Sequence, residues 1–540
     1  MFIRKFEREN KDADNDVKKK LLGLSDIEIY ERVKALALYN YYKGKSKDYD
    51  SAAANNDHVE LGQNWKVNDN LDYSPTQTIS NKIKPLLRKQ ARWMFGKAPD
   101  IIIKSDESND INNKLCEDLR KYLENILNNK FWKETRQAFL LSTIKKRVAV
   151  RIAAIPKKKY LKIRYETIDN ISYKEIDGRI IEIKYFGESP KNATTNNSAD
   201  KIYYIYKYYY KEKEIKVEES TVLVMVPYFS KLTYKGDDLN NPIEETEEEF
   251  NKNNHEIGFD DVNSLPCWVI KNSPDMEEPL GTSEVEDLID LQDERNRKIS
   301  DFADAIKFAI FGGKAIVDAT EETVNDLKSA PGAIHAIKTE QAVLEKGKQA
   351  TIENQEYSLS CAPAVIDFLN TLETDMKTAL DMPDIKDLTN IPSAKAMKYL
   401  NNDLIARCEE KWSDWEPYLL ELIDYILHIS SEMKLPGWKE EFKNLIDKCT
   451  IKFKHNYPLP EDESEAKEVA MKEVDTGVRS KRSYLKDFSD EEDSEEAYKN
   501  ILEEKGLEAD IAMGSLGFNK DEDEGNDPSK EGNKGKEVNE

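Results

Sequence analysis

The chain has 540 residues, of which 39% are hydrophobic and 34% charged, and its formal net charge is −24. This length suits several folding units, because single hydrophobic cores stop growing at about 250–300 residues. The acidic balance argues against a protein that grips nucleic-acid phosphates over its whole surface, and it is also typical of an ordinary solvated acidic surface.

The five cysteines are far apart and form no Cys-x-x-Cys pair. Most of them lie in apolar or helical stretches, which favours buried free thiols and folding in a reducing cytoplasm. The first residues lack an apolar segment of signal-peptide length, and the sequence holds no apolar run of about 18 residues. We therefore expect no secretion signal and no membrane span.

The first quarter of the chain is expected to be helical. Residues 1–24 are charged and are expected to be a flexible N-terminus, and Ser25 is a good N-cap for a helix over 26–42. A polar loop then reaches about residue 70. Apolar periodicity predicts helices at 76–95, 111–128 and 131–143, with a short strand at 101–103.

From Val148 the apolar period changes to two, so residues 148–226 are expected to form a β-rich region. The Asp177-Gly178 pair predicts a tight turn between strands at 171–176 and 179–186. The other expected strands are 148–152, 160–165, 203–210, 215–217 and 222–226. The acidic stretch 240–254 is expected to be a solvated loop or linker.

Six tyrosines within residues 203–210 allow a second interpretation of that segment, a platform on which nucleic-acid bases stack. Tyrosine is a strong strand former, however, and the flanking residues alternate acid and base rather than forming a basic groove. We therefore favour an ordinary strand.

Residues 279–430 predict two helices, an insert, a short loop and a longer helix. The first helix is expected within 279–310, with Ser283 as N-cap and Glu286 at the capping-box position. Its apolar face is interrupted in the middle by Gln292 and Asn296. The insert 311–358 is expected to hold a strand at 314–318, a helix at 321–328 and a strand at 333–337.

The second helix is expected within 359–382, with Pro363 at its first turn. A loop bounded by two prolines spans 383–392, and Ser393 is expected to cap a helix that runs to about residue 430. The remaining expected elements are a short helix at 438–445, a strand at 450–454 and helices at 461–474 and 494–504. Residues 514–540 are nearly devoid of apolar residues and are expected to be a disordered acidic tail.

The sequence contains no recognisable catalytic motif. Gly312-Gly313-Lys314 lacks the spacing and the hydroxyl of a P-loop. The five histidines stand singly, without Cys or His partners at ligand spacing. Because acids are so numerous, chance explains any close carboxylate pair. We expect no enzyme, no metal site and no cofactor.

Several short segments of the chain are informative because of their order and spacing. They are 265–272 (LPCWVIKN), 281–289 (GTSEVEDLI), 291–296 (LQDERN), 300–301 (SD), 81–83 (NKI), 94–99 (MFGKAP), 392–398 (PSAKAMK) and 477–480 (GVRS). No single segment is specific, but together they are. Over roughly residues 30–508 the chain resembles the portal proteins of tailed bacteriophages, in the branch typified by the portal of phage SPP1.

The resemblance implies a mainly α fold with an inserted β-rich region (α+β) and a subunit with wing, stem, clip and crown that assembles into a ring. It implies a wing at 25–278, stem helices at 279–310 and 359–382, a clip at 311–358, a tunnel loop at 383–392, a long helix returning to the wing at 393–460 and a crown at 461–513. Rings of twelve subunits at one capsid vertex would form the channel through which double-stranded DNA is packaged and ejected.

The implied partners are the terminase large subunit, the head-completion adaptor of the head–tail connector, and the major capsid and scaffolding proteins, with no membrane. The protein would be assembled in the bacterial cytoplasm and reside in the virion.

The residues themselves, without the resemblance, are also compatible with a ring. Two amphipathic helices joined by a small insert suit packing against copies of the chain, and a heterologous interface that closes gives a ring. An ordinary helical domain packed on its neighbours explains the same pattern.

The resemblance assigns candidate site residues to three regions. Those facing DNA in the tunnel loop are Asp384, Lys386, Asp387, Thr389, Asn390 and Lys395. Those of the stem are Glu286, Asp293, Arg297, Asp301 and Asp375. Those contacting partners at the clip are Lys314, Glu321, Glu322, Lys328 and Lys338.

The mechanism that the resemblance suggests is electrostatic. An acidic channel would weaken the attraction to DNA phosphates, so that DNA slides, while Lys386 and Lys395 would touch the DNA backbone transiently. The alternative for both lysines is that they are ordinary exposed charges without a role in DNA contact.

Two other functions of the protein stay open. One is a virion or scaffold-type structural protein without a DNA channel, which would not form rings with a through-channel. The other is a hidden nuclease or packaging enzyme, which metal-dependent cleavage or ATP turnover would reveal.

Overall fold

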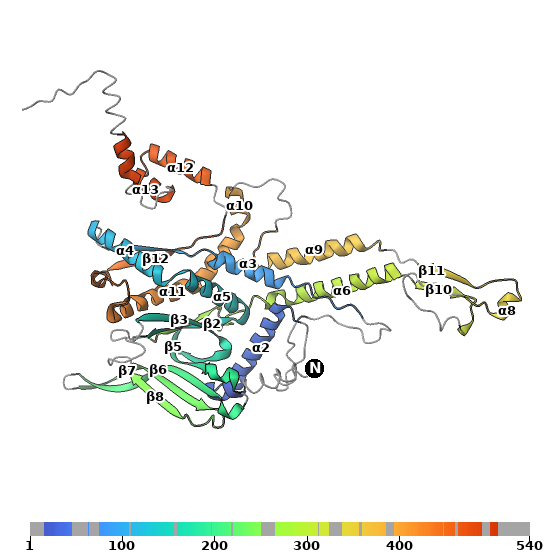
Figure 1. Cartoon of the computed structure of the whole chain (residues 1–540), viewed down its shortest axis with the longest axis horizontal. Helices are drawn as coiled ribbons and strands as arrows, with labels where there is room; N and C mark the ends of the chain where they lie inside the picture. The colour runs from blue at the N-terminus through green and yellow to red at the C-terminus, as the bar shows by residue number, and fades with distance from the viewer. Residues whose placement is uncertain are drawn as a thin grey trace, which may run out of the picture. The chain divides into compact units, whose positions relative to one another are not determined.

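The computed structural model describes residues 16–45, 63, 75–106, 110–155, 159–176, 178–195, 197–217, 220–249, 265–311, 313–322, 337–355, 359–384, 394–446, 448–459, 463–488 and 497–505. Two compact units are present, residues 1–391 with 397–458, and residues 392–396 with 459–540. Helices and antiparallel sheets together make an α+β fold (Figure 1).

The helical part of the first unit consists of long helices with clear start signals. They are α2 (Asp26–Lys43), α3 (Ile83–Phe95), α4 (Asp110–Ile126), α5 (Asn129–Lys145) and α11 (Asn402–Met433). Ser25 caps α2 as predicted and forms a capping box with Glu28. Asn128 caps α5 by accepting the N–H groups of Lys130 and Phe131.

Aromatic side chains from α3, α5 and α11 fill the core between these helices. The ring of Phe95 lies 6.1 Å from Trp132, 5.7 Å from Phe139, 5.9 Å from Trp412 and 5.2 Å from Trp415. All five side chains are buried. Replacing such a buried aromatic residue by alanine costs about 3–5 kcal/mol of stability. This cluster therefore fixes α11 against α3 and α5.

The strands form antiparallel sheets. A three-stranded sheet has the order β3-β2-β9, with β2 (Arg147–Ile155), β3 (Tyr160–Thr167) and β9 (Cys267–Lys271). A five-stranded sheet runs in chain order through β4 (Ile171–Ile176), β5 (Arg179–Glu188), β6 (Ile202–Val217), β7 (Ser220–Lys235) and β8 (Glu244–Glu249). Strand β1 (Asp100–Ser105) pairs with β12 (Cys449–Lys454). The 3-10 turns are η2 (Ile168–Asn170), η3 (Pro190–Thr194), η4 (Ser198–Asp200), η5 (Glu286–Leu288) and η6 (Glu440–Asn444).

The two larger sheets are joined through Arg151 of β2. Its guanidinium lies 4.8 Å from the ring centroid of Tyr185 and 4.7 Å from that of Tyr206. The hydroxyl of Tyr185 also donates to the backbone carbonyl of Val150 at 3.1 Å. The tyrosine run belongs to β6, and Tyr203 and Tyr208 are only 2% exposed. The predicted strand is therefore confirmed, and two of its six tyrosine rings are buried in the sheet.

Several predicted elements differ in extent. Strands β6 and β7 pair over their whole lengths, where the sequence suggested three shorter strands. The acidic stretch 240–254 was predicted as a loop, but Glu244–Glu249 pairs with β7 as strand β8. Lys211 stabilises this acidic strand, because its ammonium lies 3.2 Å from the carboxylate of Glu247. Residues 250–254 lie outside the described part.

The two ends of the N-terminal region also differ from the predictions. Residues 16–22 are helical rather than frayed, because Leu21 and Leu22 are buried against Phe186, Tyr203 and Ile205. The predicted helix 76–95 begins only at Ile83, and residues 75–82 have no regular secondary structure. Residues 1–15 lie outside the described part.

The central block contains two long helices joined through a strand pair. Its elements are α6 (Ile289–Phe311), β10 (Gly313–Val317), α8 (Gln341–Leu344), β11 (Thr351–Gln355) and α9 (Ala362–Thr378). The predicted strand 314–318 corresponds to β10, but its partner β11 was not predicted. The predicted helix 321–328 and strand 333–337 fall almost wholly outside the described residues.

The predicted start of the first long helix is wrong. Ser283 does not cap α6, which begins only at Ile289; its hydroxyl donates to the carbonyl of Ile144 at 2.7 Å and accepts the N–H of Val285 at 3.3 Å. Residues 286–288 form η5 instead, and α6 begins at Ile289. The predicted helix 393–430 is also interrupted. Asn401 separates α10 (Ala394–Leu400) from α11, and its side-chain amide donates to the carbonyl of Met397 at 2.7 Å.

The second unit is small and helical in its described part. It contains α12 (Glu463–Asp475) and α13 (Lys481–Phe488), and residues 497–505 are also helical. Arg479, between the first two helices, lies 3.6 Å from Glu473 and also pairs with Asp487. The predicted helices at 461–474 and 494–504 are confirmed where they are described, whereas α13 was not predicted.

The cysteines carry no disulfide. Cys116, Cys267 and Cys408 are buried free thiols, as predicted for most of the five, whereas Cys361 is exposed and Cys449 is half-buried. Burial raises the pKa of the Cys408 thiol to about 12. These thiols are therefore protonated at neutral pH and behave as small apolar side chains.

Candidate functional site

The helices α6 and α9 lie side by side and form the most distinctive part of the first unit (Figure 1). The chain leaves along α6, passes through the antiparallel β10–β11 pair and returns along α9, so the two helices are antiparallel. Leu372 and Met376 of α9 are buried. On α6, by contrast, a row of polar side chains is buried.

This buried polar row consists of Gln292, Asn296, Ser300 and Asp304, which are at most 6% exposed. They recur at every fourth residue and therefore lie on one face of α6. Buried polar groups are costly unless they are hydrogen-bonded. The extended segment 76–82 supplies their partners.

Each of the four side chains accepts a backbone N–H from this segment. Asp304 binds Thr76 at 2.9 Å, Ser300 binds Thr78 at 3.1 Å, Asn296 binds Ser80 at 3.0 Å and Gln292 binds Lys82 at 2.9 Å. Two extended residues span about 6.6–6.8 Å and four helical residues about 6 Å, so the two repeats match. Segment 76–82 thus runs antiparallel to α6, and we call these contacts the polar ladder.

Gln63 connects the polar ladder to α2, and Asp293 connects α6 to α2 directly. The amide of Asn296 donates to the side-chain oxygen of Gln63 at 2.9 Å, and the Gln63 amide donates to the carbonyl of Tyr41 at 3.0 Å. The Tyr41 hydroxyl lies 2.6 Å from Asp293 of α6. Burial and this carboxylate raise the pKa of Tyr41. Asp293, predicted as a stem residue, is thus part of the junction between α2 and α6.

An ion cluster joins the polar ladder to α9. Glu373 of α9 lies 2.9 Å from Lys82, 3.5 Å from Lys377 and 3.7 Å from Arg295. Burial raises the pKa of Glu373, but the hydrogen bond from Lys82 and the three cations outweigh burial and hold it below its usual value. Glu373 is therefore ionised at neutral pH and links segment 76–82, α6 and α9.

The same cluster reaches Asp384, the second residue of the predicted tunnel loop. Asp384 accepts hydrogen bonds from Lys377 at 3.0 Å and from the Thr374 hydroxyl at 2.7 Å. Burial lowers the pKa of Lys377, but Asp384 and Glu373 outweigh burial and raise it. Asp384 was predicted to face DNA, and in the structure it ties the start of this loop to α9.

A second ion cluster is buried where α11 meets the end of α9. Glu284 is 2% exposed and lies 2.6 Å from Lys411 and 3.4 Å from Arg407. Burial raises the pKa of Glu284, but the two cations outweigh burial and lower it. Arg407 also lies 2.8 Å from Asp381, which has a φ of 52°. This cluster holds the left-handed turn that ends α9.

The outer surface of the helix pair has two kinds of residue. On α9 one exposed face carries Asp367, Thr371, Asp375 and Thr378, and the single lysine of α9, Lys377, is engaged by Glu373 and Asp384. Apolar side chains are exposed nearer the β10–β11 end. They are Phe308 (47%), Ile310 (71%), Ile366 (49%) and Phe368 (41%).

The other predicted site residues are dispersed. Among stem residues, Glu286 lies 3.2 Å from Lys34, Arg297 lies 2.9 Å from Glu294, and Asp301 is exposed. At the clip, Glu321 and Glu322 are exposed, and Lys338 lies 3.2 Å from Glu322. The backbone of Lys314 pairs with Asn354 in β10–β11. Lys386, Asp387, Thr389, Asn390 and Lys328 lie outside the described residues, and for Lys395 only its place in α10 is described.

Sequence reasoning missed the residues that build the junctions. Glu373, Glu284 and Arg407 come from elements far apart in the chain, so no local spacing marks them. Gln292 and Asn296 did carry a signal, because they interrupt an otherwise apolar helical face. Two polar residues four positions apart on such a face indicate a polar partner.

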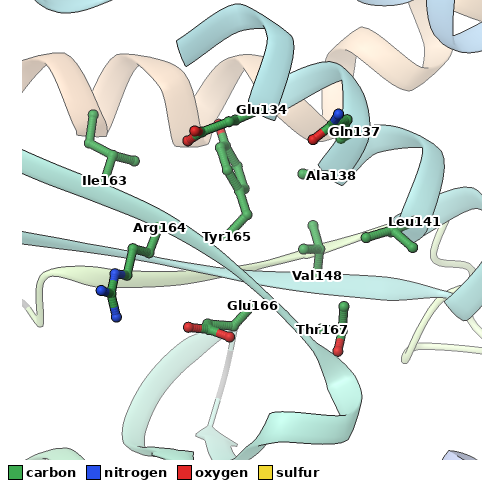
Figure 2. A pocket seen from close by; sticks show the side chains of 10 residues that line it. All are labelled: Glu134, Gln137, Ala138, Leu141, Val148, Ile163, Arg164, Tyr165, Glu166 and Thr167. Carbon is green, nitrogen blue, oxygen red and sulfur yellow. The ribbon is translucent and has the colours of Figure 1, made fainter. Parts of the chain in front are cut away.

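A second candidate site is a cavity of about 360 Å³ between α5 and β3. Figure 2 shows Glu134 and Tyr165 on the α5 side of β3, and Arg164 and Glu166 on its other side. The two carboxylates do not face one another, so they form no acid–base pair. Within the described residues no cluster of His, Cys, Asp and Glu is arranged to hold a metal ion. In the same part of the chain no helix has the length and apolar character of a membrane span.

Two comparisons with known proteins place these features in context. A family model described as phage portal protein, SPP1 Gp6-like, matches residues 24–510, which is most of the chain. No curated protein matches the chain.

Proposed function

Because the chain belongs to the SPP1 Gp6-like family of phage portal proteins, we propose that its α6–α9 pair is the subunit's share of a DNA channel at one capsid vertex. Members of this family are structural virion proteins of DNA packaging rather than enzymes. The family also implies a homo-oligomeric ring and DNA passage. The channel would serve both packaging and ejection of the genome.

The observation that carries the proposal is the exposed face of α9. Asp367 and Asp375 alternate there with Thr371 and Thr378, and the only lysine of the helix is engaged in the ion cluster. A surface of carboxylates and hydroxyls repels phosphates and still hydrates them, so it lets a duplex slide. We assign this face to the channel wall.

The exposed apolar residues support contact between neighbouring copies. Phe308 and Ile310 on α6, with Ile366 and Phe368 on α9, are large apolar residues that are exposed toward the β10–β11 end of the pair. Exposed apolar residues of this kind support an interaction surface. In a ring, each α6–α9 pair packs against the next through a heterologous contact, and twelve copies close the circle in the virion.

The remaining regions take the roles that the family suggests. Residues 25–278 form the wing, 311–358 the clip that meets the terminase large subunit and later the head-completion adaptor, and 461–513 the crown. Residues 383–392 form the tunnel loop, with Lys386 and Lys395 as transient phosphate contacts. Glu321, Glu322 and Lys338 are exposed or paired at the insert surface, where a protein partner can reach them.

The test is electron microscopy of the purified protein together with its mass in solution. Rings of about a dozen subunits with a central channel are the expected result. Compact closed dimers without a channel would contradict the proposal and favour a scaffold-type structural role.

A further inference from the structure

A second, larger cleft lies away from the helix pair. It has a volume of about 720 Å³ and is bounded by α11, β9 and the turn between β4 and β5. Its floor is aromatic, because the ring of Trp268 packs edge to face against Tyr418 at 5.4 Å and Tyr425 at 5.2 Å. The cleft is too polar at its rim to take a purely apolar ligand.

Three carboxylates of α11 form one side of this rim. Asp414, Glu421 and Asp424 are seven and three residues apart, so they lie on the same side of the helix. Their contacts are with neutral groups or histidine. Asp414 accepts the N–H of Ser273 at 3.0 Å, Glu421 accepts the indole N–H of Trp268 at 2.6 Å, and Asp424 lies 3.5 Å from His428.

Cations contribute little to the cleft. Lys271 is neutralised by Glu175 at 2.9 Å, which leaves Arg179 at the hairpin turn. Within the described residues, none of the three α11 carboxylates forms an ion pair with lysine or arginine. Burial raises the pKa of Asp414 and outweighs the hydrogen bond from Ser273 and the charge of Lys411, which lower it.

Pro417 lines the cleft between Asp414 and Tyr418. The three carboxylates make the rim rich in hydrogen-bond acceptors, and aromatic rings line the floor.

We propose that this cleft binds an arginine- or lysine-bearing segment of a basic partner protein. Carboxylates form charge-assisted hydrogen bonds with guanidinium and ammonium groups, and aromatic rings attract the same cations. The cleft is lined by more acidic than basic side chains, which favours a basic occupant, and a second copy of this chain is the other occupant that the test distinguishes. This inference does not depend on the ring or on the channel.

The test uses the full-length protein and a fluorescein-labelled peptide, Gly-Arg-Gly-Arg-Gly, with its citrulline counterpart as a neutral control. The variant Asp414→Asn/Glu421→Gln removes two charges from the cleft. The variant Glu410→Gln/Glu416→Gln removes two charges from the same helix at positions that do not line it. Anisotropy titrations measure the dissociation constant, and circular dichroism checks folding.

We expect the arginine peptide to bind the natural protein and the control variant equally, and the cleft variant at least about tenfold more weakly. Equal binding to all three proteins, or equal binding of the citrulline peptide, would overturn the proposal. The mass of the protein in solution distinguishes a second copy of this chain from a basic partner as the occupant of the cleft. If the cleft variant loses self-assembly while the control variant keeps it, the cleft belongs to a second copy and the proposal fails.

Discussion

The backbone N–H of Lys82 donates to the side-chain oxygen of Gln292 at 2.9 Å, while the ammonium of Lys82 lies 2.9 Å from Glu373. Lys82 therefore ends the polar ladder on α6 and begins the ion cluster on α9. One residue of an extended segment couples both helices. The orientation of the α6–α9 pair depends on this coupling as well as on apolar packing between the helices.

The first prediction concerns the polar ladder. Asn296→Leu should lower the free energy of unfolding by about 2–4 kcal/mol, because Ser80 and Gln63 both lose buried hydrogen bonds. Urea denaturation measures the change. Asp301→Leu, an exposed position on the same helix, is the control and should change stability by less than about 0.5 kcal/mol. Equal effects of both substitutions would show that the ladder contributes nothing.

The second prediction concerns the buried ion cluster. Glu284→Gln should destabilise the protein by about 3–5 kcal/mol at pH 7, because Lys411 and Arg407 lose their buried partner. Glu286→Gln, two residues away and partly exposed, should cost less than about 1 kcal/mol.

The pH dependence of the same variant follows from the lowered pKa of Glu284. A carboxyl whose folded pKa is depressed stabilises the fold above its unfolded pKa of about 4.3 and loses this stabilisation as pH falls through the folded value. The natural protein should therefore lose stability steeply below about pH 4, and Glu284→Gln should lose less. Parallel stability curves for the two proteins would argue against this assignment.

The third prediction tests the channel wall. Asp367→Lys/Asp375→Lys places two cations per copy on the exposed face of α9. Rings should still form, but packaging should slow or stall and recover as salt rises, because the new charges hold phosphates. Packaged DNA length against time is the readout. Glu410→Lys/Glu416→Lys on α11 makes the same change of charge and should package normally.

The fourth prediction tests the contact between copies. Phe308→Ser/Ile310→Ser should weaken ring assembly while leaving the monomer's thermal unfolding nearly unchanged, because both side chains are exposed in the single chain. Mass photometry counts the copies. Glu345→Ser in the insert is exposed as well and serves as control. Rings that persist unchanged would remove this patch from the interface.

The fifth prediction concerns the tunnel loop. Deleting residues 384–391 should leave rings intact and block packaging, because the loop is the proposed DNA contact of the channel; the deletion also removes the bond from Lys377 to Asp384. The variant Asp384→Asn separates anchoring from DNA contact. It weakens the bond to Lys377 and should reduce packaging less than the deletion does. Normal DNA filling in the deletion variant would exclude a role for the loop.

Local sequence signals predicted most elements of this protein. Ser25 marked the start of α2, and the Asp177-Gly178 pair correctly placed the strands β4 and β5 on either side of it. The change of apolar period at Val148 predicted the β-rich region. These signals succeed because caps, turns and periodicity act over a few residues. The ordered short motifs likewise predicted the family to which the chain belongs.

Only the tertiary structure decided the elements whose partners are distant in sequence. Segment 76–82 has a helical pattern, yet it is extended because α6 offers acceptors for its N–H groups more than two hundred residues away. The acidic residues of β8 form a strand because β7 supplies the pairing edge. Glu373 and Glu284 became junction residues because cations from several elements meet around them. A sequence states which groups need partners, but burial and hydrogen bonding across the fold decide which partners they find.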